Sequence, residues 1–236
     1  MIKISVFSDF ACPYCYIGEM RLMNAIRSLG LTDRVQVEFK AFELDPHVPK
    51  AVVTNNTERL MQKYRFPEDV AKSQINQINQ LGRDMGLDMN YQDARYSNTR
   101  DAHRLMKLAE DQETAEVVYK LNFALFDAYF NRAEVLADHK VLSKIAAEAG
   151  MDMAKVVMML ESDQYEKEVL ADEHEAENHG IKSIPYFIFN GESRVPGAVA
   201  EDDFKHLLTR EVEKKDARNI TLGKPHACNS KSCDLV

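Results

Sequence analysis

Apolar and polar positions alternate at the start of the chain and then change to helical spacing. Residues 2–7 alternate with a period of two, which is typical of a half-buried strand. From Pro13 to about Leu29, apolar residues recur every three or four positions and Gly30 follows, so a helix is expected. Alternation returns over residues 34–42. Strand, helix and strand in this order predict a βαβ unit with a parallel pair of strands.

A long segment with helical spacing follows this unit. After a proline-marked loop, almost every stretch between Thr57 and Asn178 has the period of a helix. The expected helices span residues 57–65, 67–85, 97–111, 113–130, 138–149, 152–160 and 163–178. Aspartates suited to N-capping stand at the start of the last three, at Asp138, Asp152 and Asp163.

The strand pattern returns near the end of the chain. Residues 184–195 contain a continuous apolar run and the dipeptide Asn190-Gly191, which indicates a hairpin. Residues 200–212 predict a final amphipathic helix, and the tail at 214–236 is polar and rich in turn residues. The order of elements predicts an α/β fold, in which a four-stranded sheet is flanked by helices and a large all-helical insertion follows the second strand.

Composition and charge narrow the function classes. The 236 residues are 45% hydrophobic and 29% charged, which suits a packed core. The net charge of −8 argues against nucleic acid as a partner, because phosphate binding needs clustered Lys and Arg. No apolar run is long enough to span a bilayer, so no membrane partner is expected. The first residues lack the regions of a signal peptide and therefore predict a cytoplasmic protein.

Two cysteines stand three positions apart in "FACPYC", directly before or within the start of the first predicted helix. Unpaired N–H groups and the helix dipole at a helix start favour the thiolate form of Cys12, and Pro13 suits the first turn. Cys15 lies one turn further in and is expected to be more buried. We therefore expect Cys12 to be the attacking sulfur and Cys15 the resolving one. A static disulfide, half a zinc site and a pair of inert thiols are the alternatives.

Three segments together resemble the DsbA family of thioredoxin-like dithiol–disulfide oxidoreductases. They are "FACPYC" after the first strand, the helical insertion after the second, and "GIKSIPYFIFNG" at 180–191 followed by "RVPGA" at 194–198. The resemblance covers about the first 210 residues and implies a thioredoxin-like, four-stranded mixed sheet. It implies a thioredoxin-like domain at 1–43 and 180–213, a helical insertion domain at 57–178 and a C-terminal tail at 214–236.

The same resemblance implies site residues beyond the cysteines. In such folds the proline that opens the third sheet strand forms a cis peptide bond and faces the cysteine pair, and here this position is Pro185. The backbone of Ile184 is then exposed for pairing with an extended substrate. Pro13 and Tyr14, which stand between the two cysteines, are expected to contact substrate together with Ile184.

Two positions depart from the pattern of the family. The dipeptide Pro13-Tyr14 resembles that of glutaredoxins, whereas DsbA-type oxidases more often have Pro-His, so a less oxidising disulfide is expected. Some relatives carry an acidic residue six positions before the first cysteine. Here that position is Val6, which leaves the proton acceptor of Cys15 unassigned.

A second cysteine pair, Cys228 and Cys233, lies in the tail with the spacing CxxxxC. This extension resembles that of the FrnE-like subgroup of the family. The resemblance implies a relay of electrons to or from the first cysteine pair. A passive disulfide and a zinc site that includes His226 are the alternatives.

The sequence thus predicts an oxidoreductase that exchanges disulfides with protein thiols, with no cofactor or metal. A thiol reductant or glutathione is the expected recycling partner. Two other functions stay open: a glutathione-dependent isomerase or transferase of the kappa type, and a zinc-binding module built on all four cysteines. Enzymes of the kappa type carry a serine at the position of Cys12 and do not need a second cysteine, so Cys15 favours dithiol chemistry. The remaining histidines are scattered and are interpreted as surface or capping residues.

Overall fold

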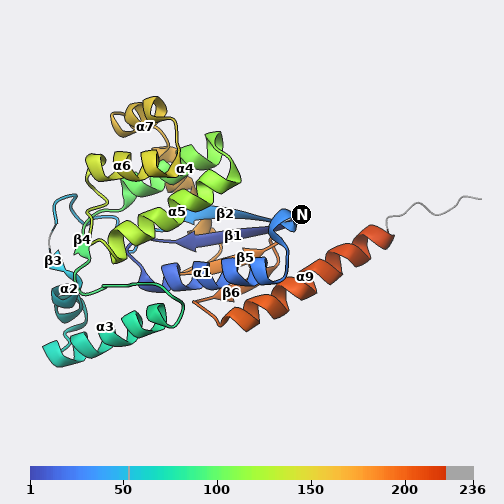
Figure 1. The fold of residues 1–236 in the computed structure, drawn as a ribbon, viewed down its shortest axis with the longest axis horizontal. Helices are drawn as coiled ribbons and strands as arrows, with labels where there is room; N and C mark the ends of the chain where they lie inside the picture. Colours follow the sequence, from blue (N-terminus) through green and yellow to red (C-terminus); the bar gives the residue numbers. More distant parts are fainter. Residues whose placement is uncertain (53, 222–236) are drawn as a thin grey trace, which may run out of the picture.

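A four-stranded mixed sheet forms the centre of the protein (Figure 1). The computed structural model describes residues 1–52 and 54–221, without the side chains of 218–221. The strands lie in the order β2-β1-β5-β6 and comprise β1 Ile2–Ser8, β2 Val35–Ala41, β5 Tyr186–Phe189 and β6 Ser193–Pro196. β1 pairs in parallel with β2 and antiparallel with β5, and β5 pairs antiparallel with β6. The predicted α/β fold with a mixed four-stranded sheet is confirmed.

The connections around the sheet follow from local sequence. Helix α1, Pro13–Ser28, joins β1 to β2 through a short 3-10 helix at Thr32–Arg34. The hairpin between β5 and β6 turns at Asn190 and Gly191, whose φ angles are 52° and 74°. These left-handed values suit asparagine and glycine, which explains why this dipeptide marks the turn.

The helical insertion has the elements that the periodicity predicts. They are α2 Asn56–Tyr64, α3 Glu68–Arg83, α4 Arg100–Gln112, α5 Ala115–Phe130, α6 His139–Ala149, α7 Met153–Leu160 and α8 Glu166–Asn178. Asp138 and Asp152 cap α6 and α7, as expected. A two-residue ladder between β3, Thr54–Asn55, and β4, Arg95–Tyr96, was not predicted, because strands this short carry no periodic signal.

The expected start of the last insertion helix at Asp163 is wrong. Helix α8 begins at Glu166, and a tertiary contact explains the delay. The guanidinium group of Arg104 in α4 donates to the carbonyl oxygens of Met159, Ser162 and Gln164. These bonds hold the segment between α7 and α8 as a loop, which overrides the local capping signal of Asp163.

The final helix is longer than predicted. Helix α9 runs over Glu201–Thr221, so the first residues of the polar tail are helical. This part has no apolar period, but it contacts the start of the chain: Asp216 pairs with Arg34 at 2.7 Å, and Lys215 bonds the carbonyl oxygen of Met1. Such contacts stabilise a polar helix that propensity alone would leave marginal.

The insertion helices close the outer edge of strand β2. Glu110 Oε1 accepts from the N–H of Phe39 at 2.7 Å, and Asp172 Oδ2 accepts from the N–H of Ala41 at 3.0 Å. Lys107 Nζ donates to the carbonyl oxygen of Phe39 at 2.7 Å. The edge groups of a sheet are otherwise free to pair with another chain. Side chains of α4 and α8 therefore take the place of a neighbouring strand here.

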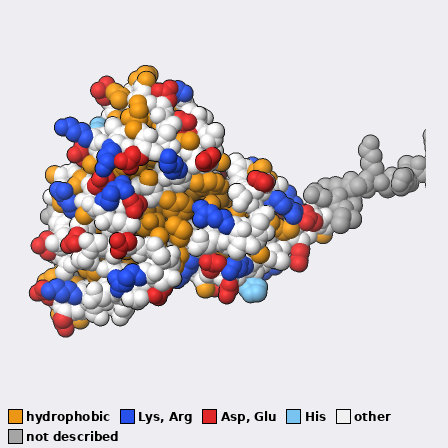
Figure 2. All heavy atoms as spheres, in the orientation of Figure 1, with side chains coloured by type: hydrophobic (Ala, Val, Ile, Leu, Met, Phe, Trp, Pro, Cys, Tyr) orange, Lys and Arg blue, Asp and Glu red, His pale blue; other side chains and the backbone are white. Residues whose placement is uncertain are grey.

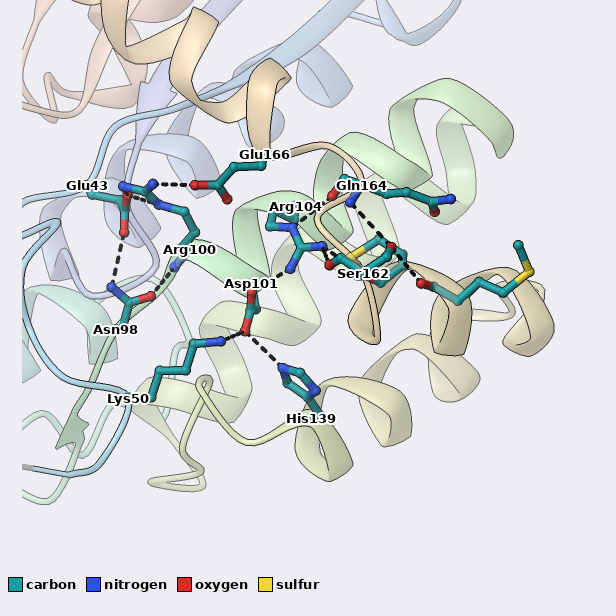
Figure 3. Close-up of polar contacts among 12 residues, drawn as sticks. Glu43, Lys50, Asn98, Arg100, Asp101, Arg104, His139, Ser162, Gln164 and Glu166 are labelled. Atoms are coloured by element: carbon teal, nitrogen blue, oxygen red, sulfur yellow. Dashed lines mark hydrogen bonds and ion pairs between the residues drawn. The ribbon is translucent and has the colours of Figure 1, made fainter.

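Ion pairs tie the segment after β2 to the helices (Figure 3). Arg100 of α4 contacts Glu43 through Nε at 2.5 Å and Glu166 of α8 through Nη1 at 2.7 Å. Glu43 also accepts from Asn98 at 3.4 Å. Because the Glu43 carboxylate is buried, these contacts compensate its loss of water.

One apolar core joins the sheet and the insertion. Val6 of β1, Leu22 of α1, Leu125 of α5 and Met159 of α7 belong to the same cluster of buried side chains. The division of the chain into domains stays a prediction. Among the described residues, no helix is long and apolar enough to cross a membrane.

Candidate active site

Cys12 and Cys15 lie where strand β1 passes into helix α1. Cys12 is the N-cap residue of the helix and Pro13 is its first residue. The N–H of Cys15 donates to the carbonyl oxygen of Cys12 at 3.1 Å, and both thiols are free. Cys12 is 5% exposed and Cys15 is 0% exposed, which confirms that Cys15 is the more buried thiol. Cys12 is therefore the more accessible of the two sulfurs.

The Ile184–Pro185 segment faces this cysteine pair. The peptide bond between the two residues is cis, as predicted. The Cys12 thiol points at the carbonyl oxygen of Ile184, with 3.9 Å between Sγ and O. Segments far apart in the sequence thus meet at one sulfur.

Gly18 allows this close approach. A Cβ atom at this position of α1 would lie 3.1 Å from Cγ of Pro185 and 3.3 Å from Cζ of Phe187. Both distances are shorter than ordinary van der Waals contact. The helix that carries the cysteines can therefore pack against Pro185 because residue 18 has no side chain.

A buried carboxylate holds the loop before Cys12. Asp9 is 2% exposed, and its two oxygens accept from the N–H groups of Ala11 at 3.0 Å and Leu44 at 2.7 Å. Burial raises the pKa of Asp9, but His103 and these N–H groups outweigh it, so the pKa lies below its usual value. His103 Nε2 lies 3.7 Å from Asp9 Oδ1. Because His103 is 4% exposed, its interpretation as a surface or capping residue is wrong.

Glu19 is a second buried acid, one helical turn beyond Cys15. Its side chain is 1% exposed, and Asn122 of α5 donates to its Oε2 at 2.6 Å. Its Oε1 has no hydrogen-bond partner among the described residues. Burial raises the pKa of Glu19 to about 7, although hydrogen bonds with Asn122 and Ser8 lower it. The group can therefore exchange a proton near neutral pH.

The thiol of Cys15 holds its proton strongly, so its deprotonation needs a nearby proton acceptor. Burial raises the pKa of Cys15 well above that of a free thiol. The neighbouring Cys12 raises it further, and so does the charge of Glu19. Residues at i and i+4 of a helix have their Cβ atoms about 6 Å apart. This spacing makes Glu19 the candidate proton acceptor of Cys15.

A cavity of about 310 Å³ opens beside Cys12. Cys12, Pro13 and Tyr14 line it from one side, and helices α2 and α3 line it from the other. Tyr14 both lines the cavity and is 43% exposed to solvent. The predicted contact residues Pro13, Tyr14 and Ile184 are therefore all adjacent to the Cys12 sulfur or its cavity.

A groove of larger volume lies elsewhere on the protein, away from the two described cysteines. It measures about 730 Å³ and is lined by the β2 residues Val35 and Val37 and by Tyr119 of α5. Figure 2 shows apolar side chains gathered in the middle of one face of the molecule, in the region where Figure 1 places α5 and β2. Neither cysteine of the described residues lines this groove, so the smaller cavity is the candidate site.

The remaining predicted residues lie outside the described part of the chain. They are Cys228, Cys233 and His226. The relay, the passive disulfide and the zinc site therefore stay predictions. Within residues 1–52 and 54–221, no group of three or more metal-binding side chains could hold a metal ion.

Comparison with known proteins agrees with this geometry. A family model described as a DSBA-like thioredoxin domain matches residues 3–209. The chain belongs to this family. At the family level, membership of the DSBA-like group supports thiol–disulfide oxidoreductase activity. The predicted resemblance to the DsbA family is confirmed.

Individual relatives of this DSBA-like protein extend along nearly its whole length. The uncharacterized protein YwbO of Bacillus subtilis (strain 168) is 27% identical over 217 residues, which cover 91% of this chain and 99% of YwbO. The crystal structure of the probable DsbA oxidoreductase SCO1869 from Streptomyces coelicolor has a TM-score of 0.83 and 27% identity, and each chain is covered completely. The cytosolic disulfide reductase DsbM from Pseudomonas aeruginosa shares the fold, with a TM-score of 0.60, 15% identity and coverage of 90% and 99%. A second structure of DsbM contains GSH.

Glu19, Asp9 and His103 were not predicted as site residues. For Glu19 a signal existed, because Cys15, Glu19 and Leu22 stand at helical spacing and therefore share the buried face of α1. An acidic residue on an apolar face predicts a buried carboxyl group. No comparable signal marked Asp9 or His103, whose contact joins the loop before Cys12 to helix α4.

Proposed function

We propose that this DSBA-like protein is a dithiol–disulfide oxidoreductase that exchanges disulfides with protein thiols through Cys12 and Cys15. The observation that carries the proposal is the arrangement of the pair. Cys12 stands at the start of α1 with its sulfur facing the carbonyl oxygen of Ile184, and Cys15 is wholly buried behind it.

The chemistry follows from these positions. The Cys12 thiolate attacks a substrate disulfide, one S–S bond breaks, and a mixed disulfide with Cys12 forms. Cys15 passes its proton to Glu19 and attacks the Cys12 sulfur, which releases the substrate as a thiol. The reverse sequence transfers the disulfide from the protein to a dithiol substrate. Pro13, Tyr14 and Ile184 contact the substrate, and Pro185 lies opposite the pair.

A mechanism that uses both cysteines is favoured over a glutathione-dependent reaction of the kappa type. Cys15 is buried next to Cys12, and the buried Glu19 lies one helical turn beyond Cys15. A reaction that uses one sulfur would leave both residues without a role. Glutathione or another thiol is instead the recycling partner. The GSH in a structure of DsbM supports this assignment, and the cytosolic location of DsbM supports a cytoplasmic one here.

Two cysteine variants test the proposal. Cys12→Ser abolishes insulin reduction, because no nucleophile remains at the helix start. Cys15→Ser accumulates mixed disulfides at Cys12, which are detected by mass under non-reducing conditions. Full catalytic turnover in Cys15→Ser with glutathione as the only thiol would refute the dithiol mechanism and favour the kappa-type reaction.

The proposal also assigns the tail cysteines to a relay, as in the FrnE-like subgroup. Exchange between the two pairs requires a tail sulfur to attack, or to be attacked by, a sulfur of the Cys12–Cys15 pair.

A Cys228→Ser/Cys233→Ser double variant tests this relay. It is expected to slow both insulin reduction and the reoxidation of Cys12–Cys15, and to keep the reaction of Cys12 with small disulfides. Unchanged rates in both assays contradict the relay. Stoichiometric zinc that is lost in the double variant instead supports the metal alternative.

A further inference from the structure

The cavity beside Cys12 has a positively charged wall in a chain whose net charge is −8. Its charged lining residues are Arg59 and Lys63, both on helix α2. No carboxylate of the described residues lines it. The charge of this cavity is therefore opposite to that of the protein as a whole.

Arg59 is held in place but not neutralised. Its guanidinium carbon lies 3.6 Å from the centroid of the Tyr96 ring, which fixes the side chain by a cation–π contact. Its charge lowers the pKa of Tyr91, a residue of the same cavity wall, against the larger opposing influence of burial. Among the described residues, no carboxylate forms an ion pair with Arg59. The fork of N–H donors is thus open to an anion.

Lys63 has a similar arrangement one turn later. Its ammonium group lies 5.9 Å from the centroid of the Tyr64 ring, and in the described chain it makes no ion pair. Tyr64 stacks on Phe66, with 5.5 Å between ring centroids, and both line the cavity. The cavity therefore combines an apolar, aromatic surface with two unpaired cations.

We infer that this cavity binds low-molecular-weight disulfides that carry a carboxylate, with Arg59 and Lys63 as the anion-binding side chains. Its volume of about 310 Å³ is at the small end for ligand pockets, which suits a small molecule rather than a folded segment. The inference rests on the proposed function, because Cys12 opens into the same cavity.

Binding in this cavity places one disulfide sulfur against Cys12. The thiolate attacks that sulfur, the S–S bond of the small molecule breaks, and one half leaves as a thiolate. The other half stays bound to Cys12 as a mixed disulfide, with its carboxylate between the two cations. Attack by Cys15 releases this half as a second thiolate. One small disulfide is reduced to two thiols, and the protein dithiol is oxidised to one disulfide.

Three symmetrical disulfides of different charge test the inference. Reduced protein is mixed with dithiodipropionate, which is a dianion, with neutral hydroxyethyl disulfide and with cystamine, which is a dication. Each oxidation rate is divided by the rate for dithiothreitol in the same buffer, which cancels intrinsic reactivity. The wild type prefers the dianion, and added salt weakens this preference. Arg59→Met/Lys63→Met slows the dianion reaction by about tenfold and changes the neutral reaction less than twofold.

A matched pair of substitutions controls for net charge. Lys72→Met/Arg83→Met removes two cations of helix α3 that do not line the cavity, and keeps the wild-type preference. Arg59→Lys restores part of the preference if the charge itself acts. An equal loss in both double variants overturns the inference. A charge preference seen only with acidic peptide disulfides also overturns the inference, because the cavity would then serve protein substrates. Failure of all three probes to oxidise wild-type Cys12 refutes the proposed function instead.

Discussion

Replacing Glu19 with glutamine keeps the shape of a buried side chain and removes its charge. Asn122 can still donate to the amide oxygen, so the packing between α1 and α5 is preserved. Burial raises the pKa of Glu19 from 4.5 to about 7. This difference of about 2.5 corresponds to about 3 kcal/mol of free energy of unfolding.

The sign of the pH effect follows from linkage. The folded protein holds the Glu19 proton up to about pH 7, whereas the unfolded chain loses it near pH 4.5. The wild type is therefore most stable, relative to Glu19→Gln, below about pH 4.5. Between pH 4.5 and 7 it loses about 3 kcal/mol of stability that the glutamine variant retains. Urea unfolding of the reduced wild type and the reduced Glu19→Gln variant, at pH 4.5 and at pH 8, measures this difference. The pH effects of other groups cancel because they are the same in both proteins.

The catalytic readout separates proton transfer from stability. A mixed disulfide at Cys12 is prepared with a chromophoric thiol, and its release by Cys15 is followed in a stopped-flow instrument. In the wild type this rate rises with an inflection near pH 7, the pKa of Glu19. In Glu19→Gln the inflection disappears, and release at pH 8 is slower by about 10²-fold, the lower range for a positioned base.

A buried glutamate far from the cysteines provides the control. Glu211 of α9 is 2% exposed and bonds Asn190 and Ser193, so Glu211→Gln removes a buried charge with no route to Cys15. This variant keeps the inflection near pH 7. If Glu19→Gln also keeps it, the proton of Cys15 goes elsewhere and the role of Glu19 is refuted. A relative stability change below about 1 kcal/mol shows instead that the Glu19 pKa is not raised.

The other predictions concern stability. Asp101 contacts Lys50, His139 and Arg104 (Figure 3), and although burial raises its pKa, these hydrogen bonds lower it to about 2. The ionised Asp101 therefore contributes about 2 kcal/mol to the free energy of unfolding, which is fully present above pH 4 and is lost as pH falls through about 2. Urea unfolding is expected to show that Asp101→Asn is less stable than the wild type at pH 7. The two proteins approach the same stability near pH 2. Gly18→Ala forces Pro185 and Phe187 away from α1, lowers stability by about 1 kcal/mol and slows insulin reduction; an alanine variant that is more stable than the wild type contradicts this packing.

The spacing of apolar residues along the sequence predicted those elements of the fold that bury one face. The sheet strands β1 and β2, helix α1 and the insertion helices all do so, and each was expected close to its actual bounds. The failures are elements whose limits depend on distant residues. The loop before α8 is set by Arg104 in α4, and the end of α9 is stabilised by Met1 and Arg34. No local window of the sequence contains both partners of these contacts.

The same distinction explains which parts of the site could be predicted. Cys12, Cys15 and Pro185 carry local motifs, and the structure brings Ile184, the neighbour of Pro185, to the Cys12 sulfur. The acid–base part has no such motif. The position of Glu19 on the buried face of α1 is visible in the sequence, but the rise of its pKa needs a water-excluding contact with α5.

A carboxyl group that stays half-protonated at pH 7 must be buried without a cation to compensate its charge. Asn122 meets this requirement, because an amide donates to Oε2 but brings no positive charge. Elsewhere in this protein buried acids face cations: Asp101 contacts Arg104, and its pKa falls to about 2. The two carboxyl groups have similar burial and opposite pKa shifts. For these two carboxyl groups, the partner residue therefore decides whether burial is offset, as at Asp101, or raises the pKa into the range of proton transfer, as at Glu19.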